Sequence, residues 1–211
     1  MSNILAIDTT IGGCSVAHSN GASQTIDERN KQTSQLTAMV EAVMQDTRFD
    51  DLDAYAVTIG PGSFTGVRIG LAFVRGLALA KPKPIYAITT LELLAYQAIE
   101  AGAEGEILSA VNAHRNQLYL QSFAVKEGIA IATDEACAIN LEDIPKGEFA
   151  LAGDAEHFFD NHDSIAKLPN AESLARYAQK LPLPKLGDKP APIYLRAPDA
   201  KAQKGDLTVA Q

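Results

Sequence analysis

The sequence of 211 residues contains no tryptophan, only two cysteines, and no hydrophobic run near the roughly 18 residues that a membrane-spanning helix needs. Cys14 and Cys137 are too few and too far apart for a disulfide framework, and we expect Cys14 to be a buried, unreactive thiol. The N-terminus lacks the basic flank of a signal peptide. These absences predict a soluble protein of the cytoplasm.

Basic residues are scarce in most of the chain. Residues 1–180 contain 13 basic and 23 acidic residues, whereas residues 181–211 contain 5 basic and 3 acidic ones. Because an acidic surface repels a phosphate backbone, the chain alone is a poor candidate for tight nucleic-acid binding. We expect residues 197–211 to form a flexible, solvated tail.

The sequence also lacks the clustered ligands of a metal centre. None of its four histidines are four residues apart, and Ser63 does not lie in a Gly-x-Ser-x-Gly motif. The turn Gly60–Ser63 is not followed by the Gly-Lys-Ser/Thr of a Walker loop. We therefore expect no catalytic residue, no metal site and no cofactor.

Hydrophobic periodicity predicts an α/β architecture. In the first half we expect strands at 4–7, 14–18, 23–28, 54–59 and 85–88, and helices at 33–46, 64–80 and 89–99. In the second half, weaker patterns predict strands at 106–112, 117–125, 129–132 and 149–152, and helices at 154–160 and 171–181. A boundary near Gly102–Gly105 would divide the chain into lobes of 1–102 and 103–196.

The segment from Gly60 to Ala80 combines a glycine-rich turn with a helix that has two apolar stripes. One stripe contains Val67, Leu71, Val74 and Ala78, and the nearly opposite one contains Ile69, Phe73, Leu77 and Ala80. Two stripes indicate that both faces are covered, either within the chain's own domain or by another protein. Since a lobe of about 100 residues has little material to bury such a helix, we favour a protein–protein contact.

Asp8, Thr9 and Thr10 follow the first strand, where an acid and hydroxyl groups can bind magnesium and phosphate or simply cap a turn. We retain these three residues as a vestigial phosphate-binding candidate. Three antiparallel strands opened by such a turn, followed by alternating helices and strands, resemble the first lobe of the actin-like ATPases and sugar kinases.

Three segments make the resemblance more specific: Ile4–Thr9, Cys14–Ala17 and Gly60–Gly70, with Pro192–Arg196 at the end of the chain. In these segments the chain is similar to the TsaB (YeaZ) family. The resemblance implies an α/β fold of two actin-like, ribonuclease H-like lobes, each a mixed sheet with flanking helices, the second lobe being smaller and degenerate. It also implies a non-catalytic subunit in the synthesis of N6-threonylcarbamoyladenosine at position 37 of tRNA.

The family further implies particular partners: a catalytic paralogue, TsaD, the ATPase TsaE, and tRNA only through the complex. In this family the first-lobe helices of two subunits pack into a bundle, either in a homodimer or with TsaD. The apolar residues of the earlier helix could join this contact, although core packing explains them equally well. The expected interface set is Leu36, Met39, Val40, Val43, Phe64, Val67, Arg68, Leu71, Val74, Arg75 and Ala78.

Two departures from the family pattern bear on function. Gln32 stands where many members have His, and Asn112-Ala113-His114 stands where many have Asp-Ala-Arg, so Asn112 cannot be a carboxylate ligand or base. The alternatives are a stand-alone homodimeric scaffold and an ATP-dependent kinase or ATPase of the actin-like fold. A kinase would need a second phosphate loop at the start of lobe two, where the chain has Ala110–His114 instead.

Overall fold

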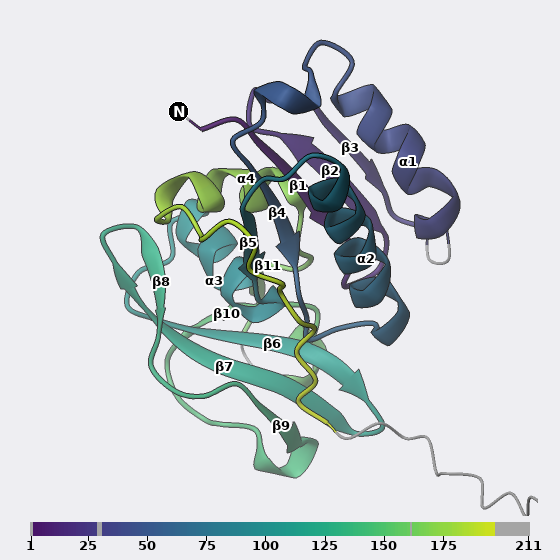
Figure 1. Ribbon diagram of the computed structural model, residues 1–211. Helices are drawn as coiled ribbons and strands as arrows, with labels where there is room; N and C mark the ends of the chain where they lie inside the picture. Colours follow the sequence, from purple (N-terminus) through teal and green to yellow (C-terminus); the bar gives the residue numbers. More distant parts are fainter. Residues whose placement is uncertain (1, 29–30, 161, 197–211) are drawn as a thin grey trace, which may run out of the picture.

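The computed structural model describes residues 2–28, 31–160 and 162–196, which form two β-sheets with helices around and between them (Figure 1). The expected tail at residues 197–211 lies outside the described residues, as does the side chain of Gln32. Within the described part of the chain, no helix has both the length and the apolar character that crossing a membrane requires.

The first sheet combines a three-stranded antiparallel meander with two parallel strands. Its strand order is β3-β2-β1-β4-β5; β1 pairs antiparallel with β2 and parallel with β4. The strands are β1 (Ile4–Asp8), β2 (Cys14–His18), β3 (Ser23–Ile26), β4 (Ala54–Thr58) and β5 (Ile85–Ile88). The parallel pairing brings the ends of β1 and β4, and the turns that follow them, to one edge of the sheet.

The second sheet repeats this connectivity. Its order is β8-β7-β6-β10-β11, with β6 antiparallel to β7 and parallel to β10, while β9 pairs with a separate stretch of β7. The strands are β6 (Glu106–His114), β7 (Gln117–Lys126), β8 (Ile129–Ala132), β9 (Cys137–Asn140), β10 (Ala150–Ala152) and β11 (Ser164–Ala166). The chain therefore contains the same sheet plan twice, which confirms the expected two-lobed α/β fold.

The helices cover both faces of the first sheet. Successive residues of a strand point to opposite faces, so Leu5 and Ile7 lie in the core beneath α1 and α2, whereas Ile4 and Ala6 lie in the core beneath α4. The helices are α1 (Gln32–Val43), α2 (Phe64–Ala80), α3 (Thr90–Glu100) and α4 (Ala171–Lys180). In Figure 1, α1 and α2 lie together on one side of the first sheet.

Two helices cross the boundary expected near residue 102. Leu91 and Leu94 of α3 pack into the core of the second sheet, although α3 precedes that boundary. Leu174 and Tyr177 of α4 pack on the first sheet, although α4 follows it. The two lobes thus share their helices, an exchange that the order of elements along the chain does not reveal.

The second lobe is reduced in its helices rather than in its sheet. The first lobe has α1 between β3 and β4 and α2 between β4 and β5. In the described residues, the corresponding connections of the second lobe contain no α-helix: one has β9 and a single turn of 3-10 helix, Leu141–Asp143, and the other has a single turn, Glu156–Phe158. The latter replaces the helix expected at 154–160. β9 and β11, of four and three residues, are further strands that the sequence analysis does not predict.

Candidate functional site

The turn at Gly60–Ser63 leads from β4 into α2 as the sequence predicts. Gly60 has a positive φ of 95°, the Gly60–Pro61 peptide bond is cis, and Ser63 caps the helix. The Ser63 Oγ accepts a hydrogen bond of 3.2 Å from the Gly66 N–H, which satisfies one of the otherwise unpaired donors of the first helical turn. The helix then runs from Phe64 to Ala80 without interruption.

Three glycines of this segment allow α2 to lie directly against the backbone after β1. A Cβ on Gly62 would come within 2.5 Å of the Thr10 carbonyl oxygen, and a Cβ on Gly70 within 2.5 Å of the Thr9 Oγ1. A Cβ on Gly66 would overlap the Thr9 carbonyl oxygen. These glycines are therefore required by close packing.

Asp8, Thr9 and Thr10 form a buried polar cluster at this contact. The Thr9 Oγ1 donates to the Gly66 carbonyl oxygen at 2.7 Å, while the hydroxyls of Thr10 and Thr58 donate to Asp8 Oδ1 at 2.7 and 2.5 Å. Burial raises the pKa of the Asp8 carboxyl to about 6, against the opposing effect of these hydrogen bonds. Because all three residues are almost completely buried, a phosphate could reach them only if α2 moved away from β1.

Most residues of the expected interface set lie in the chain's own core. Four residues of α1 and two of α2, Leu71 and Val74, pack in the core over the first sheet, and Val67 is buried in the first turns of α2. Their side chains could contact a partner only if this core opened, so in this fold they are not an available surface. The seven residues, each exposed by 4% or less, are Leu36, Met39, Val40, Val43, Val67, Leu71 and Val74.

The second apolar stripe of α2 also has contacts within the chain. Ile69, Phe73 and Leu77 are half-buried and pack against the same core, as does Ala78. Both stripes are thus explained largely by intramolecular packing. The expectation that one of them must meet another protein does not follow from this structure, and the surface of α2 that is open to another protein lies elsewhere on the helix.

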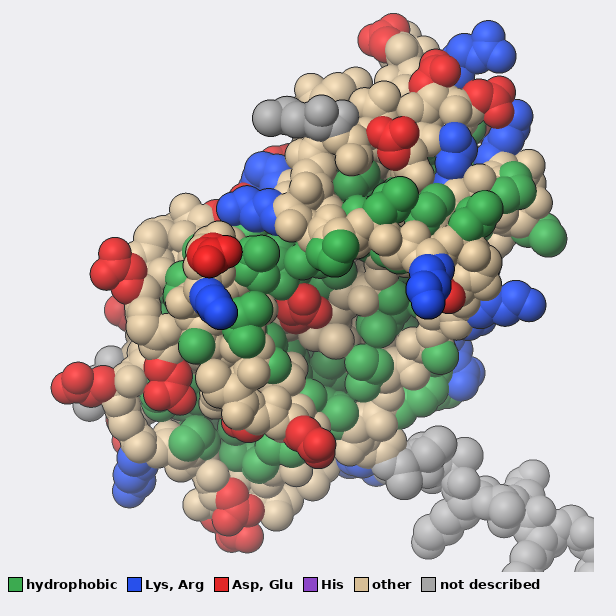
Figure 2. All heavy atoms as spheres, turned by 60° about the vertical axis from the view of Figure 1, so that its left-hand side comes forward, with side chains coloured by type: hydrophobic (Ala, Val, Ile, Leu, Met, Phe, Trp, Pro, Cys, Tyr) green, Lys and Arg blue, Asp and Glu red, His purple; other side chains and the backbone are tan. Residues whose placement is uncertain are grey.

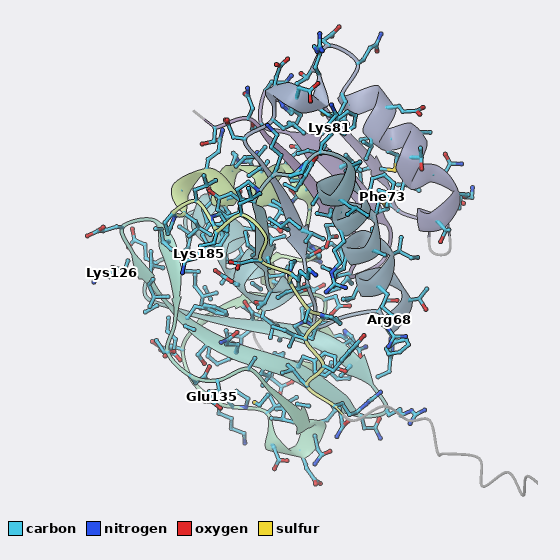
Figure 3. The ribbon with its side chains drawn as sticks, in the orientation of Figure 1. Arg68, Phe73, Lys81, Lys126, Glu135 and Lys185 are labelled. Carbon is cyan, nitrogen blue, oxygen red and sulfur yellow. The ribbon has the colours of Figure 1, made fainter. Side chains whose placement is uncertain are left out.

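The exposed face of α2 lies between the two stripes. Its small residues Ala72 and Gly76 are one helical turn apart, and Leu79 is 86% exposed. Arg68 and Arg75 border this face, and Phe64, 50% exposed, lies at its start. Figure 3 shows Arg68 at the end of α2 nearer the second sheet. Of the expected interface residues, Phe64, Arg68 and Arg75 are therefore the ones with exposed side chains.

The C-terminal segment is part of this surface, which the sequence did not predict. Arg68 Nε donates to the Tyr194 hydroxyl at 2.9 Å, and the Arg68 guanidinium lies 3.6 Å from the centre of the Phe64 ring. Arg75 donates to the Pro190 carbonyl oxygen. The motif Pro192–Arg196 was noticed in the sequence, but no periodicity indicated that its tyrosine would lie against α2.

The turn between β6 and β7 occupies the position expected for a second phosphate loop. His114, Arg115 and Asn116 all have φ between 55° and 60°, a conformation that costs non-glycine residues energy. Asp154 Oδ1 accepts a hydrogen bond of 2.8 Å from the Asn112 N–H, and burial raises the pKa of the Asp154 carboxyl. Asn112 thus has a carboxylate next to it that comes from the turn after β10.

Neither polar cluster contains a typical set of metal ligands. In residues 2–28, 31–160 and 162–196 no group of three His, Cys, Asp or Glu side chains is arranged to hold a metal ion. Asp8 and Asp154 are each the single carboxylate of their cluster, held by hydroxyl or backbone donors. The chemistry available at these positions is that of hydrogen-bonded packing between a strand end and the following turn.

Comparison with known proteins gives consistent relatives. A family model described as "TsaD: tRNA N6-adenosine threonylcarbamoyltransferase" matches residues 27–184. The tRNA threonylcarbamoyladenosine biosynthesis protein TsaB of Escherichia coli is 35% identical over 121 residues, which are 55% of this chain and 52% of that protein. The TsaB protein of Buchnera aphidicola from Schizaphis graminum is 37% identical over 121 residues, 58% of its length. The chain thus spans about half the length of these curated relatives.

Other relatives match over nearly the whole chain. A Mycobacterium tuberculosis protein described as uncharacterized is 32% identical over 214 residues, 95% of each chain. YeaZ from Pseudomonas aeruginosa superimposes with a TM-score of 0.81 at 28% identity, over 92% of this chain and 100% of that one. A second Pseudomonas aeruginosa structure, described as similar to peptidase YEAZ, gives a TM-score of 0.82 at 28% identity, over 93% of this chain and 100% of its own.

The glycine contact predicts opposite effects for two alanine substitutions in α2. Gly66→Ala should destabilise the protein by about 2 kcal/mol or more, because the new methyl group overlaps the Thr9 backbone. Gly76→Ala should stabilise it by about 0.5–1 kcal/mol, because Gly76 is exposed, has open space around it, and alanine favours helix. Urea unfolding at low protein concentration measures the free energy of unfolding of both variants. Equal effects of the two substitutions would contradict the proposed packing.

The buried Asp8 carboxyl predicts a pH dependence of stability. The unfolded chain releases this proton near pH 4 and the folded chain near pH 6, so the folded state holds the extra proton between these values. Stability should therefore fall as pH rises through this window, by about 3 kcal/mol in all from this group and by about 2 kcal/mol between pH 4.5 and 7. Urea unfolding of wild type and Asp8→Asn at pH 4.5 and 7 measures the difference. A fall of the same size in Asp8→Asn would assign it to other groups.

Proposed function

Because this chain belongs to the TsaB (YeaZ) family, we propose that it takes part in the biosynthesis of threonylcarbamoyladenosine in tRNA, the process for which its curated TsaB relatives are named. Within that process we assign it a non-catalytic role: it binds and activates the larger paralogue TsaD. The observation that carries the proposal is the exposed face of α2, which has polar side chains only at its borders and small side chains at its centre.

The chemistry of that face suits another helix. Ala72 and Gly76, four residues apart, leave a shallow groove on the helix surface that lets a second helix approach closely. Leu79 and Phe64 supply apolar area at the two ends, and an 86% exposed leucine gains most from being covered. Arg68 and Arg75 can form hydrogen bonds around the rim, where they remain partly hydrated.

The polar clusters favour a non-catalytic subunit. Thr9 and Thr10 use their hydroxyl hydrogens within the chain, and the Gly66 contact closes the space in front of them. A phosphate at this position would need donors that point outward. The turn at Ala113–Asn116 in the second lobe contains no glycine to bring backbone N–H groups close to a phosphate. These features support the non-catalytic role over that of an ATP-dependent kinase or ATPase.

The remaining partners follow from the same role. TsaE would join through the complex with TsaD, and tRNA would be bound by the assembly, because the net charge of −8 on this chain opposes direct binding of a phosphate backbone. A homodimer through the α2 face is the competing arrangement. It would use the same residues, so the two assemblies exclude each other at this surface.

Substitutions on the exposed face test this assignment. Ala72→Glu and Leu79→Glu should each weaken binding to TsaD at least tenfold, about 1.4 kcal/mol, because a charge is buried or repelled at a packed contact. Both positions are exposed, so the fold should be unaffected. Leu71→Glu or Val74→Glu would disrupt the core instead. Isothermal titration of the full chain with TsaD measures the dissociation constants.

The control is Ile131→Glu, which places the same charge at a half-exposed apolar residue of β8, in the other sheet. If Ala72→Glu, Leu79→Glu and Ile131→Glu all bind TsaD as tightly as the wild type, α2 is not part of the contact with TsaD. Sedimentation of the chain alone reports self-association through the same face. For the kinase alternative, calorimetry with Mg-ATP decides, since micromolar binding by the isolated chain would contradict the non-catalytic role.

A further inference from the structure

An open groove runs along β5, the last strand of the first sheet. Its volume is about 590 Å³, and all four residues of β5, Ile85–Ile88, line it. Because side chains alternate between the faces of a strand, four consecutive residues line one groove only where it follows the backbone edge. The face turned forward in Figure 2 carries hydrophobic side chains across its middle, with acidic groups among them.

The backbone on this side of β5 has no strand partner. The carbonyl oxygens of Pro84 and Ile88 accept hydrogen bonds from the β4 side, from the N–H groups of Tyr55 and Ile59. In a parallel pair the residues facing the neighbouring strand alternate, so the N–H and C=O groups of Ile85 and Ala87 point away from β4. In the described part of the chain no strand pairs with this edge. Two donors and two acceptors therefore face the groove.

The opposite wall is the segment after α4, which cannot itself complete the sheet. It contains Pro182, Pro184 and Pro190, which have no N–H to donate. It is held at one end by the Tyr86 hydroxyl, which donates to the Leu181 carbonyl oxygen at 3.3 Å, and at the other by Arg75. Figure 3 shows Lys185 on this segment, beside the first sheet. The groove thus has two fixed walls.

Glu92 gives the groove a charge without a counterion. Its Oε1 accepts a hydrogen bond of 2.8 Å from the Tyr177 hydroxyl, and no basic group of the described residues pairs with it. Burial raises the pKa of the Glu92 carboxyl. Asp188 and Lys189 also line the groove and offset one another, so Glu92 sets its net charge. A basic side chain is the group that this environment attracts most.

We propose that the β5 groove binds an extended peptide segment of a partner protein, which adds a strand to the sheet and places a lysine or arginine near Glu92. Such strand addition takes affinity from backbone hydrogen bonds and specificity from alternate side chains. Ala87 presents no bulk or charge at the edge, unlike the lysines and prolines that usually block strand addition. No residue of α2 lines the groove, although Arg75 at the border of the α2 face holds one of its walls, and the proposal does not depend on the proposed function.

The test uses the full chain and three capped seven-residue peptides. One alternates valine with lysine, one alternates valine with glutamate, and one has proline at the centre of the valine–lysine sequence. The valine–lysine peptide should bind at least tenfold more tightly than the other two. Its binding should also slow hydrogen exchange at the Ile85 and Ala87 amides, as measured by NMR. Binding without that protection, or no binding, overturns the proposal.

Two variants separate the backbone and charge contributions. Ala87→Pro removes an outward N–H while leaving the β4 hydrogen bonds, and should weaken binding of the valine–lysine peptide at least tenfold. Glu92→Gln keeps an acceptor for Tyr177 and should remove the preference for lysine over glutamate. If Ala87→Pro fails to fold, exchange protection in the wild-type protein still decides. Binding of benzylamine but of none of the peptides would make the groove a small-molecule site and overturn the proposal.

Discussion

The close approach of α2 to the end of β1 is the contact on which the rest of the first lobe depends. Gly62, in the turn before the helix, lies against Thr10, and Gly66 and Gly70, within the helix, lie against Thr9, nearer than a Cβ atom would permit. This contact fixes the rotation of the helix about its axis, so that one apolar stripe covers the sheet and the exposed face is left to the solvent. It also buries the polar cluster around Asp8. The turn after β1, where the sequence suggested a phosphate site, thereby becomes part of the core.

The two sheets have the same strand order but differ in the segments that connect their strands. Both have the strand order of a meander followed by two parallel strands, yet only the first lobe retains long helices in its connections. In the second lobe a turn of non-glycine residues with positive φ stands at the end of β6, and Asp154 holds its backbone by a hydrogen bond. The result is a second sheet that supports α3 and the C-terminal segment and presents few helical surfaces of its own.

The sequence predicts elements better than it predicts which way they face. The bounds of α2 and β5 follow from a capping serine, a proline-rich stop and an apolar run, all local signals. The direction of α2 does not, because two opposite apolar stripes leave its rotation undetermined until the glycine contacts are known. Hence the expected interface set included Leu71 and Val74, which lie in the core, and did not include Ala72, Gly76 and Tyr194, which are exposed. The β5 groove depends on residues about 100 positions apart and has no local signal.

The return of α4 to the first sheet has a consequence for synthesis of the chain. Ile4, Ala6 and Ala56 need α4 as their cover, and α4 begins only at Ala171. While the ribosome is still making the second sheet, this apolar face of the first lobe stays uncovered, at risk of non-specific association. The core between the first sheet and α4 therefore cannot form before the C-terminal part of the chain has emerged, which couples the folding of the first lobe to the synthesis of the second.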